Sequence, residues 1–209
     1  MPNLVLASAS PRRRELLASV GIAVEVRPSH VDETLAPGLP LEDALVQVAR
    51  RKAQAAAGGD PDAWVLGADT AVVVDDRVLG KPAGRDEARA MLERLSGRSH
   101  RVITAVCLVG PGGEDRSIAV TTRVWFRALA AAEIAWYTGL PEPYDKAGAY
   151  GIQGAGAALV ERIEGSYTNV VGLPLAETLA LLRGTGIPPW ERAAGRVPRA
   201  AVAGEDARP

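Results

Sequence analysis

Apolar runs that are typical of buried strands alternate along this chain with segments of helical periodicity. The first such run covers residues 4–8 and leads directly into a helical segment. In that segment Ser10 is a plausible N-cap, Pro11 suits the first helical position, and Gly21 suits the C-terminal end. The alternation continues as far as Arg183. Because strands and helices are intermixed along the chain, we expect an α/β fold.

The chain of 209 residues is long enough for one domain or for two closely joined lobes, and it has no internal repeat. We assign residues 1–186 to a single domain. Residues 187–209 are rich in proline, alanine and arginine, with little apolar content beyond Trp190, so we expect a flexible tail there. The other expected elements are a strand at 22–29, a helix at 41–57, a strand and short return strand within 64–82, a helix at 86–95, strands at 101–110 and 116–128, and helices at 131–138 and 174–183.

Composition excludes several classes of site. The formal net charge is −1, so no bulk field favours nucleic acid or a membrane, and we expect neither as a partner. Cys107 is the only cysteine, which excludes a disulfide within the chain and a cysteine-rich zinc site. A nucleophilic pair of Cys107 with His30 or His100 is conceivable, but Cys107 lies in a run typical of a buried strand. No apolar run approaches the ~20 residues of a membrane span, and no secretory signal is recognisable, so we expect a cytoplasmic protein.

The stretch LASASPRRREL places two serines and three arginines where the first helix is expected to begin. Arginines in the first turn oppose the helix dipole, whose positive end lies there. A phosphate could be held here by backbone N–H groups, by the hydroxyls of Ser8 and Ser10, and by the guanidinium groups of Arg12 and Arg13. The stretch is not a Walker A loop. The alternative is an arginine-rich helix start that faces water, and we assign Arg14 to the surface.

Three charged residues stand out against their surroundings. Lys52 follows Val48 by four residues on the apolar stripe of the helix at 41–57, so it must extend to solvent or meet an anion. Asp69 interrupts an apolar strand run, so it should be paired, bound to metal, or exposed in a cleft. Lys81 could be its ion-pair partner or could hold a substrate phosphate. Glu33 is weaker evidence, because an acidic loop residue is usually solvated.

The segment EPYDKAGAYGIQG, residues 142–154, mixes glycines with large polar residues. Irregular segments of this length are often functional, although a flexible connection is the alternative. Gln153 carries an amide donor and an amide acceptor, which fit the imide edge of uracil or thymine. Other ligands fit as well, and the residues alone do not choose among them.

Five stretches in order resemble one family, the Maf family of nucleoside triphosphate pyrophosphatases. They are SASPRR at 8–13, VDE at 31–33, GADTAVV through LGKP at 67–82, EPYDKAGAYGIQG at 142–154, and VERIEGSYTNVVGLPL at 160–175. The resemblance implies a two-lobed mixed sheet with flanking helices and a central cleft, similar to inosine triphosphatase, in a chain that is often a homodimer. It also implies hydrolysis of a nucleoside triphosphate between the α- and β-phosphates with a divalent metal, Mg²⁺ or Mn²⁺.

Carried over by motif position, Asp69 matches the catalytic aspartate, and Asp69 with Glu33 would hold the metal. An ordinary aspartate is a poor base at neutral pH, so we expect Asp69 to orient a water molecule that the metal has acidified. The positions that match substrate-binding residues are Ser8, Arg12, Arg13, Glu33, Lys52, Thr70, Lys81 and Gln153.

The segment DKAGAYGIQG is similar to the branch of the family that acts on dTTP and UTP. One alternative is the same reaction on 7-methyl-GTP or another modified nucleotide. Another is a nucleotide-binding regulator, for instance of cell division, in which hydrolysis is incidental.

Overall fold

The structure is a computed structural model that describes residues 3–58 and 62–194. In this part of the chain, strands form one mixed sheet of seven strands in the order β2-β1-β3-β5-β6-β7, with β4 paired to β3. β1 runs parallel to β2 and β3, and the other neighbours are antiparallel. The strands are β1 Leu4–Leu6, β2 Glu25–Val26, β3 Trp64–Val74, β4 Arg77–Leu79, β5 Ser99–Val109, β6 Asp115–Phe126 and β7 Val160–Glu164.

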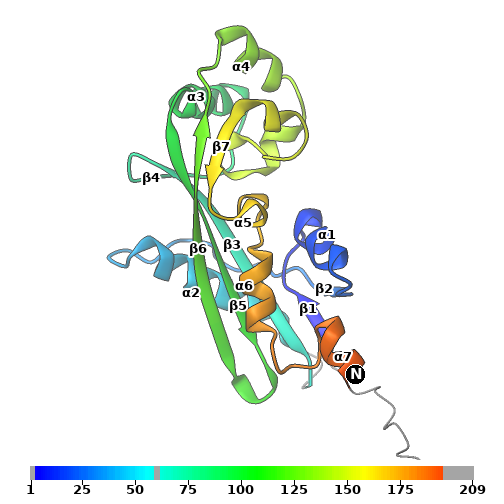
Figure 1. The fold of residues 1–209 in the computed structure, drawn as a ribbon. Coiled ribbons are helices and arrows are strands. Elements are labelled where there is room, and N and C mark those ends of the chain that lie inside the picture. Colours follow the sequence, from blue (N-terminus) through cyan, green and yellow to red (C-terminus); the bar gives the residue numbers. More distant parts are fainter. Residues whose placement is uncertain (1–2, 59–61, 195–209) are drawn as a thin grey trace, which may run out of the picture.

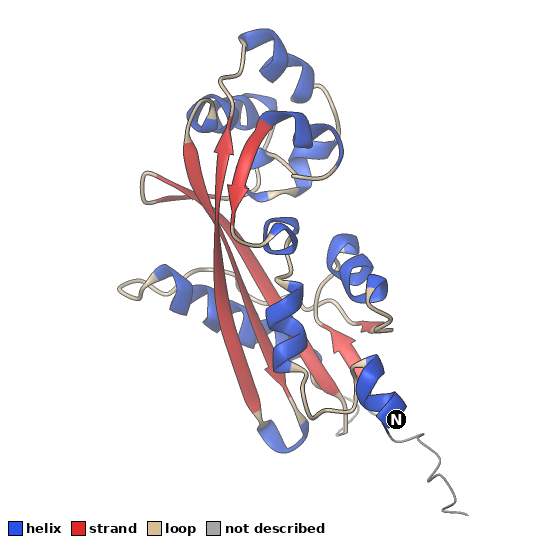
Figure 2. Cartoon of the chain, in the orientation of Figure 1, coloured by secondary structure: helices blue, strands red, loops and turns tan. Residues whose placement is uncertain are grey.

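Helices cover both faces of this sheet, as Figures 1 and 2 show. α2 packs on β3 and β5, whereas α6 packs on β6. The helices are α1 Pro11–Ser19, α2 Leu41–Ala56, α3 Arg85–Leu95, α4 Ala131–Tyr137, α5 Tyr167–Val171, α6 Leu175–Leu181 and α7 Pro189–Ala194. Four short 3-10 helices complete the described elements: η1 Pro111–Gly113, η2 Glu142–Asp145, η3 Ala147–Ala149 and η4 Gly154–Leu159. The expected α/β class is confirmed.

The hydrophobic core is divided between two lobes joined by the long strands β3, β5 and β6 (Figure 1). One cluster packs α3, α4 and the segment after α4 against one end of these strands, and it is centred on Leu92, Phe126 and Tyr137. The other clusters pack α1, α2 and α6 against the opposite end, around Leu17, Leu45 and Leu66. The predicted two-lobed arrangement is therefore confirmed.

The middle of β3 is the place where the sheet is open between the lobes. Nine of its eleven residues are buried, and the two half-buried exceptions are the neighbours Asp69 and Thr70. Both pair with β5 on one side, and on the other side they lie between the part of β3 that pairs with β1 and the part that pairs with β4. A rigid central strand therefore carries the two polar residues that the sequence singled out.

The boundary of the folded part differs from the prediction. Ile187, the first residue of the expected tail, is fully buried, and residues 189–194 form α7. The carboxylate of Glu191 accepts hydrogen bonds from the N–H groups of Gly184 and Gly186, which tie α7 back to the segment that follows α6. The predicted end of the domain at residue 186 is thus too early. The rest of the predicted tail, residues 195–209, lies outside the described residues.

The structure also bears on two points that composition raised. Cys107 lies in β5 and is fully buried, and burial raises the pKa of its thiol to about 12. A thiol that stays protonated is a poor nucleophile, which removes the Cys–His alternative. None of the helices in the described ranges is long and apolar enough to cross a bilayer.

Candidate active site

A cleft of about 720 Å³ lies between the two lobes, within the usual size range of small-molecule sites. Its walls come from the start of α1, the middle of β3, the loop after β4 and the glycine-rich segment at 142–154. Every side chain predicted from the sequence to belong to the site lines this cleft: Ser8, Arg12, Arg13, Glu33, Lys52, Asp69, Thr70, Lys81 and Gln153. Residues up to 145 positions apart in sequence therefore share one cavity.

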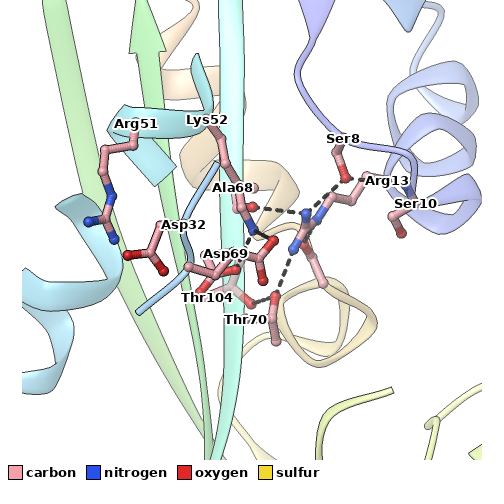
Figure 3. A network of polar contacts seen from close by, with 12 residues as sticks. Ser8, Ser10, Arg13, Asp32, Arg51, Lys52, Ala68, Asp69, Thr70 and Thr104 are labelled. Atoms are coloured by element: carbon pink, nitrogen blue, oxygen red, sulfur yellow. Dashed lines mark hydrogen bonds and ion pairs between the residues drawn. The ribbon is translucent and has the colours of Figure 1, made fainter. Parts of the chain in front are cut away.

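Lys52 and the carboxylates of Asp69 and Glu33 form the charged centre of the cleft, and Figure 3 shows the pair of Lys52 with Asp69. The Nζ of Lys52 donates to Asp69 Oδ1 at 2.7 Å and lies 2.8 Å from Glu33 Oε1. The side chains of Lys52 and Asp69 are only 9% and 16% exposed, whereas that of Glu33 is 59% exposed. A buried ammonium needs such partners, because an unpaired buried charge is costly.

The close approach of α2 to β3 brings Lys52 to Asp69. Gly67 faces α2 from β3, and a Cβ atom at this position would lie 2.1 Å from the carbonyl oxygen of Ala49 and 2.8 Å from the N of Ala53. Only glycine permits this approach without displacement of the helix. Ala49 and Ala53 flank Lys52 on α2, so the contact at Gly67 sets the height of the lysine above the strand.

The partner of Asp69 is thus Lys52, and not Lys81 as the sequence had allowed. Lys81 is exposed at the rim of the cleft. Burial alone would raise the pKa of Glu33, but the hydrogen bond and charge of Lys52, with the charges of Lys81 and Arg13, outweigh it and lower that pKa. Glu33 is therefore ionised at neutral pH and belongs to the same electrostatic cluster.

Arg13 is held by the protein itself. Its Nε donates to the carbonyl of Gly172, and its Nη1 donates to Ser8 Oγ and to the carbonyl of Ala68, all within 3.0 Å. Its Nη2 donates to Thr70 Oγ1 at 3.1 Å. Four of the five N–H groups of this guanidinium are thus directed at protein oxygens. At most one N–H remains for a phosphate, so Arg13 chiefly ties α1 to β3 and α5.

Thr70 links Arg13 to Thr104 on the neighbouring strand β5. Its hydroxyl lies 2.9 Å from that of Thr104, and Thr104 Oγ1 donates to the carbonyl of Asn169. Because the Thr104 proton is used in that bond, Thr70 donates to Thr104 and accepts from Arg13. The Thr70 hydroxyl is therefore committed within the protein, and its effect on base choice would be indirect.

Arg12 projects into the cleft from the first turn of α1. Its Nη1 lies 2.8 Å from Asp145 Oδ2, and Asp145 Oδ1 accepts from Lys146 Nζ at 2.6 Å. Burial would raise the pKa of Asp145, but its hydrogen bonds to Lys146 and Arg12 outweigh it and lower that pKa. The Arg12–Asp145 pair joins the lobes across the cleft, whereas Lys146 pairs with Asp145 from the neighbouring position. Arg14 is exposed, as expected.

The start of α1 leaves backbone donors open toward the cleft. Ser10 occupies the N-cap position, but its side chain makes no capping bond, and its own N–H donates to Ser8 Oγ. Pro11 follows, and the first turn holds no acidic residue. The first N–H groups of a helix have no partner within the helix, so this end is suited to an anion.

The glycine-rich segment is a packed wall of the cleft and not a flexible connection. It folds into η2, η3 and η4, and within it Tyr150 is buried with its hydroxyl 2.7 Å from His100 Nε2. Gln153 is exposed in the cleft, and no hydrogen bond holds its amide among the described residues. The amide is therefore available to a ligand.

The donor set fits a hard divalent cation only in part. Asp69 and Glu33 present carboxylates to one point, where Lys52 takes one oxygen of each. Across the described ranges, no group of three or more His, Cys, Asp and Glu side chains could hold a metal by itself. Mg²⁺ commonly binds through one or two carboxylates together with substrate phosphates and waters. These residues fit such an ion if the substrate completes its coordination.

Sequence reasoning missed the contributions of Asp145 and Lys146 to the charge of the site. Both stand in the segment singled out, but a contact such as Arg12 with Asp145, across 133 positions, has no signal in local patterns. An acidic and a basic residue side by side before a glycine-rich loop were the available hint.

A family model described as Maf-like protein matches residues 3–185. The dTTP/UTP pyrophosphatase of Anaeromyxobacter dehalogenans (strain 2CP-1 / ATCC BAA-258) is 56% identical over 91% of this chain and 98% of its own. That of Myxococcus xanthus (strain DK1622) is 53% identical over 90% of this chain and 95% of its own. Among solved structures, a HAM1 protein from Coxiella burnetii aligns over 94% of this chain and 100% of its own, with 16% identity and a TM-score of 0.45.

Proposed function

This chain belongs to the Maf family, and from that premise we propose that it hydrolyses dTTP and UTP between the α- and β-phosphates. The products are the nucleoside monophosphate and pyrophosphate. One observation carries the proposal: a single cleft holds both a cluster of cations around Asp69 and the unengaged amide of Gln153. The relatives named dTTP/UTP pyrophosphatase support the substrate class.

The cations that line the cleft suit the triphosphate. They are the side chains of Arg12, Lys52 and Lys81, and the open N–H groups at the start of α1 lie beside the same cleft. When the bond between the α-phosphorus and the bridging oxygen breaks, negative charge builds up on the departing pyrophosphate. Fixed cations stabilise that charge in the transition state more than in the bound substrate, which raises kcat.

We assign to Asp69 the role of orienting the water molecule that attacks the substrate. Lys52 holds Oδ1, which fixes the carboxylate on a rigid strand, and Oδ2 can accept a hydrogen bond from a water molecule. The water oxygen attacks the α-phosphorus, pyrophosphate leaves, and the proton passes to solvent. A bound Mg²⁺ or Mn²⁺, held by Asp69 and Glu33 with phosphate oxygens, would supply charge neutralisation and a more acidic water.

We assign to Gln153 the recognition of the pyrimidine base of the substrate. Its amide can accept the N3–H of uracil or thymine and donate to a carbonyl oxygen of the same edge. Thr70 would act on this choice only through Arg13 and Thr104, because its hydroxyl is committed to them.

A panel of triphosphates tests the proposed function. Purified protein with Mg²⁺ is given dTTP, UTP, CTP, ATP, GTP and 7-methyl-GTP, and pyrophosphate and monophosphate are measured for each. We expect dTTP and UTP to have the highest kcat/KM. A preference for 7-methyl-GTP would assign the chain to another substrate, and binding without turnover throughout would favour a nucleotide-binding regulator.

The same proposal covers the setting of the reaction. We infer that the partner is the free nucleotide, with neither nucleic acid nor membrane, and that the enzyme works in the cytoplasm as a homodimer. The nearly neutral net charge of −1 supports the absence of a polyanionic partner. Light scattering after gel filtration checks the dimer, and titration with EDTA followed by Mg²⁺ or Mn²⁺ checks the metal.

A further inference from the structure

Glu142 is the first residue of the glycine-rich segment, its carboxylate is partly buried, and the proposed reaction does not use it. Its Oε2 accepts from the backbone N–H of Ala155 at 3.0 Å. Its Oε1 accepts from the N–H of Gly156 at 3.0 Å and from the hydroxyl of Tyr137 at 2.9 Å. All three donors therefore converge on one side chain from α4 and from the start of η4.

Tyr137 extends this contact to the other side of Gln153. Its hydroxyl accepts from the N–H of Gly151 at 3.2 Å while it donates to Glu142. Tyr137 is fully buried. The backbone is thus held at Gly151, two residues before Gln153, and at Ala155, two residues after it.

The glycines of this segment are spaced to admit the two side chains. A Cβ at Gly154 would lie 2.7 Å from Glu142 Oε2, and Gly154 also has φ +64°, which favours glycine. A Cβ at Gly156 would lie 2.7 Å from Tyr137 Oη and 2.1 Å from the carbonyl of Gly151. The sequence GIQGAG therefore wraps its backbone closely around Glu142 and Tyr137.

Glu142 also leaves the Gln153 amide unoccupied. Gln153 stands at the N-cap position of η4, where a side chain often accepts from the following N–H groups, but it makes no such bond. Glu142 accepts from Ala155 and Gly156 in its place. The amide of Gln153 can then point into the cleft without loss of hydrogen bonds in the loop.

We propose that Glu142, with Tyr137, is a positioning residue that fixes Gln153 for recognition of the pyrimidine base, an inference that rests on the proposed function of Gln153. Glu142 does not touch substrate in this account. It acts by presenting a carboxylate to three donors, which a neutral amide cannot do because one of its two polar atoms is itself a donor.

The test compares UTP with N3-methyl-UTP, which lacks the imide N–H that Gln153 would accept. For each variant, the ratio of kcat/KM for the two nucleotides measures recognition at that edge. In Glu142→Gln we expect this ratio to fall by about fivefold. The fall should come from a higher KM for UTP with kcat little changed, because the contact to the base stabilises the bound substrate and the transition state equally. Tyr137→Phe, which removes one of the three donors and the bond to Gly151, should shift the ratio in the same direction.

Glu133→Gln is the matched control. Glu133 is also a carboxylate in the same lobe that accepts from a backbone N–H, that of Ala130, and it pairs with Arg127 away from the cleft. It should lose comparable stability and leave the UTP to N3-methyl-UTP ratio unchanged. Amide hydrogen exchange gives a second readout: residues 151–156 should exchange faster in Glu142→Gln and not in Glu133→Gln.

Gln153→Ala distinguishes a failure of the positioning role of Glu142 from a failure of base recognition by Gln153. A lower ratio in Gln153→Ala with an unchanged ratio in Glu142→Gln and Tyr137→Phe overturns the positioning role and leaves the proposed function standing. An unchanged ratio in Gln153→Ala overturns base recognition by Gln153 and the positioning role with it. Equal loss of the ratio in Glu133→Gln and Glu142→Gln would show a general effect of stability and also overturn the proposal.

Discussion

Gly67→Ala should damage both the fold and the reaction, because the substitution forces α2 away from β3. The added Cβ would lie 2.1 Å from the Ala49 carbonyl oxygen, and an ordinary contact requires about 3.5 Å, so the helix must move by more than ~1 Å. Overpacking of this kind costs about 1–3 kcal/mol, which corresponds to a fall in Tm of about 2–12 °C for a chain of this length. The displacement also separates Lys52 from Asp69.

A misplacement of about 1 Å in a catalytic arrangement can lower kcat by about 10²-fold. We therefore expect Gly67→Ala to lose about that factor for dTTP at a temperature where it is fully folded. Thermal denaturation followed by circular dichroism gives Tm, and pyrophosphate release gives kcat. Gly58→Ala is the control, because no atom lies within 4 Å of its would-be Cβ.

Two results would refute this reasoning at different steps. A Gly67→Ala protein with the Tm of Gly58→Ala would show that α2 and β3 do not meet as closely as described. A protein with a lowered Tm and normal kcat would show that the distance between Lys52 and Asp69 does not depend on that contact.

Two further predictions concern the rim of the cleft and the core of the lobe that contains α3 and α4. Asp145→Asn removes the carboxylate that pairs with Arg12, so pyrophosphate should inhibit about threefold more tightly. The free energy of unfolding should change by less than ~1 kcal/mol, because the pair is exposed. Weaker inhibition by pyrophosphate would contradict this prediction. Burial lowers the pKa of His100 to about 4, from an ordinary value of 6.5, so the unfolded chain binds the proton first as pH falls. Stability should therefore decline by up to about 3 kcal/mol between pH 6.5 and pH 4 in urea titrations, and His100→Gln should show a flatter profile over that window.

Much of this fold could be predicted from sequence because its signals are local. The predicted helix at 41–57 ends one residue beyond the observed end of α2, because its apolar stripe and its boundary signals lie in one window of sequence. Asp69 could be singled out because a carboxylate within an apolar strand must find a partner or a cleft. The identity of that partner could not be predicted, because it depends on the distance between α2 and β3.

The residues that sequence reasoning missed act through contacts between distant segments. Arg13 looked like a phosphate ligand, but its bonds to Gly172 and Ala68 appear only when β3, α1 and α5 meet. Composition likewise placed the end of the domain at residue 186, because proline and alanine gave no sign that Ile187 is buried. Local composition reports propensity, and burial is decided by the whole fold.

Hydrolysis in H₂¹⁸O by the wild-type protein and Asp69→Asn tests the central claim most directly. With dTTP or UTP and Mg²⁺, the account predicts that the wild-type protein places ¹⁸O in the monophosphate and none in the pyrophosphate. It predicts that Asp69→Asn keeps the wild-type circular dichroism spectrum and loses turnover by at least about 10³-fold. Label in the pyrophosphate, or an Asp69→Asn protein with nearly wild-type turnover, would contradict it.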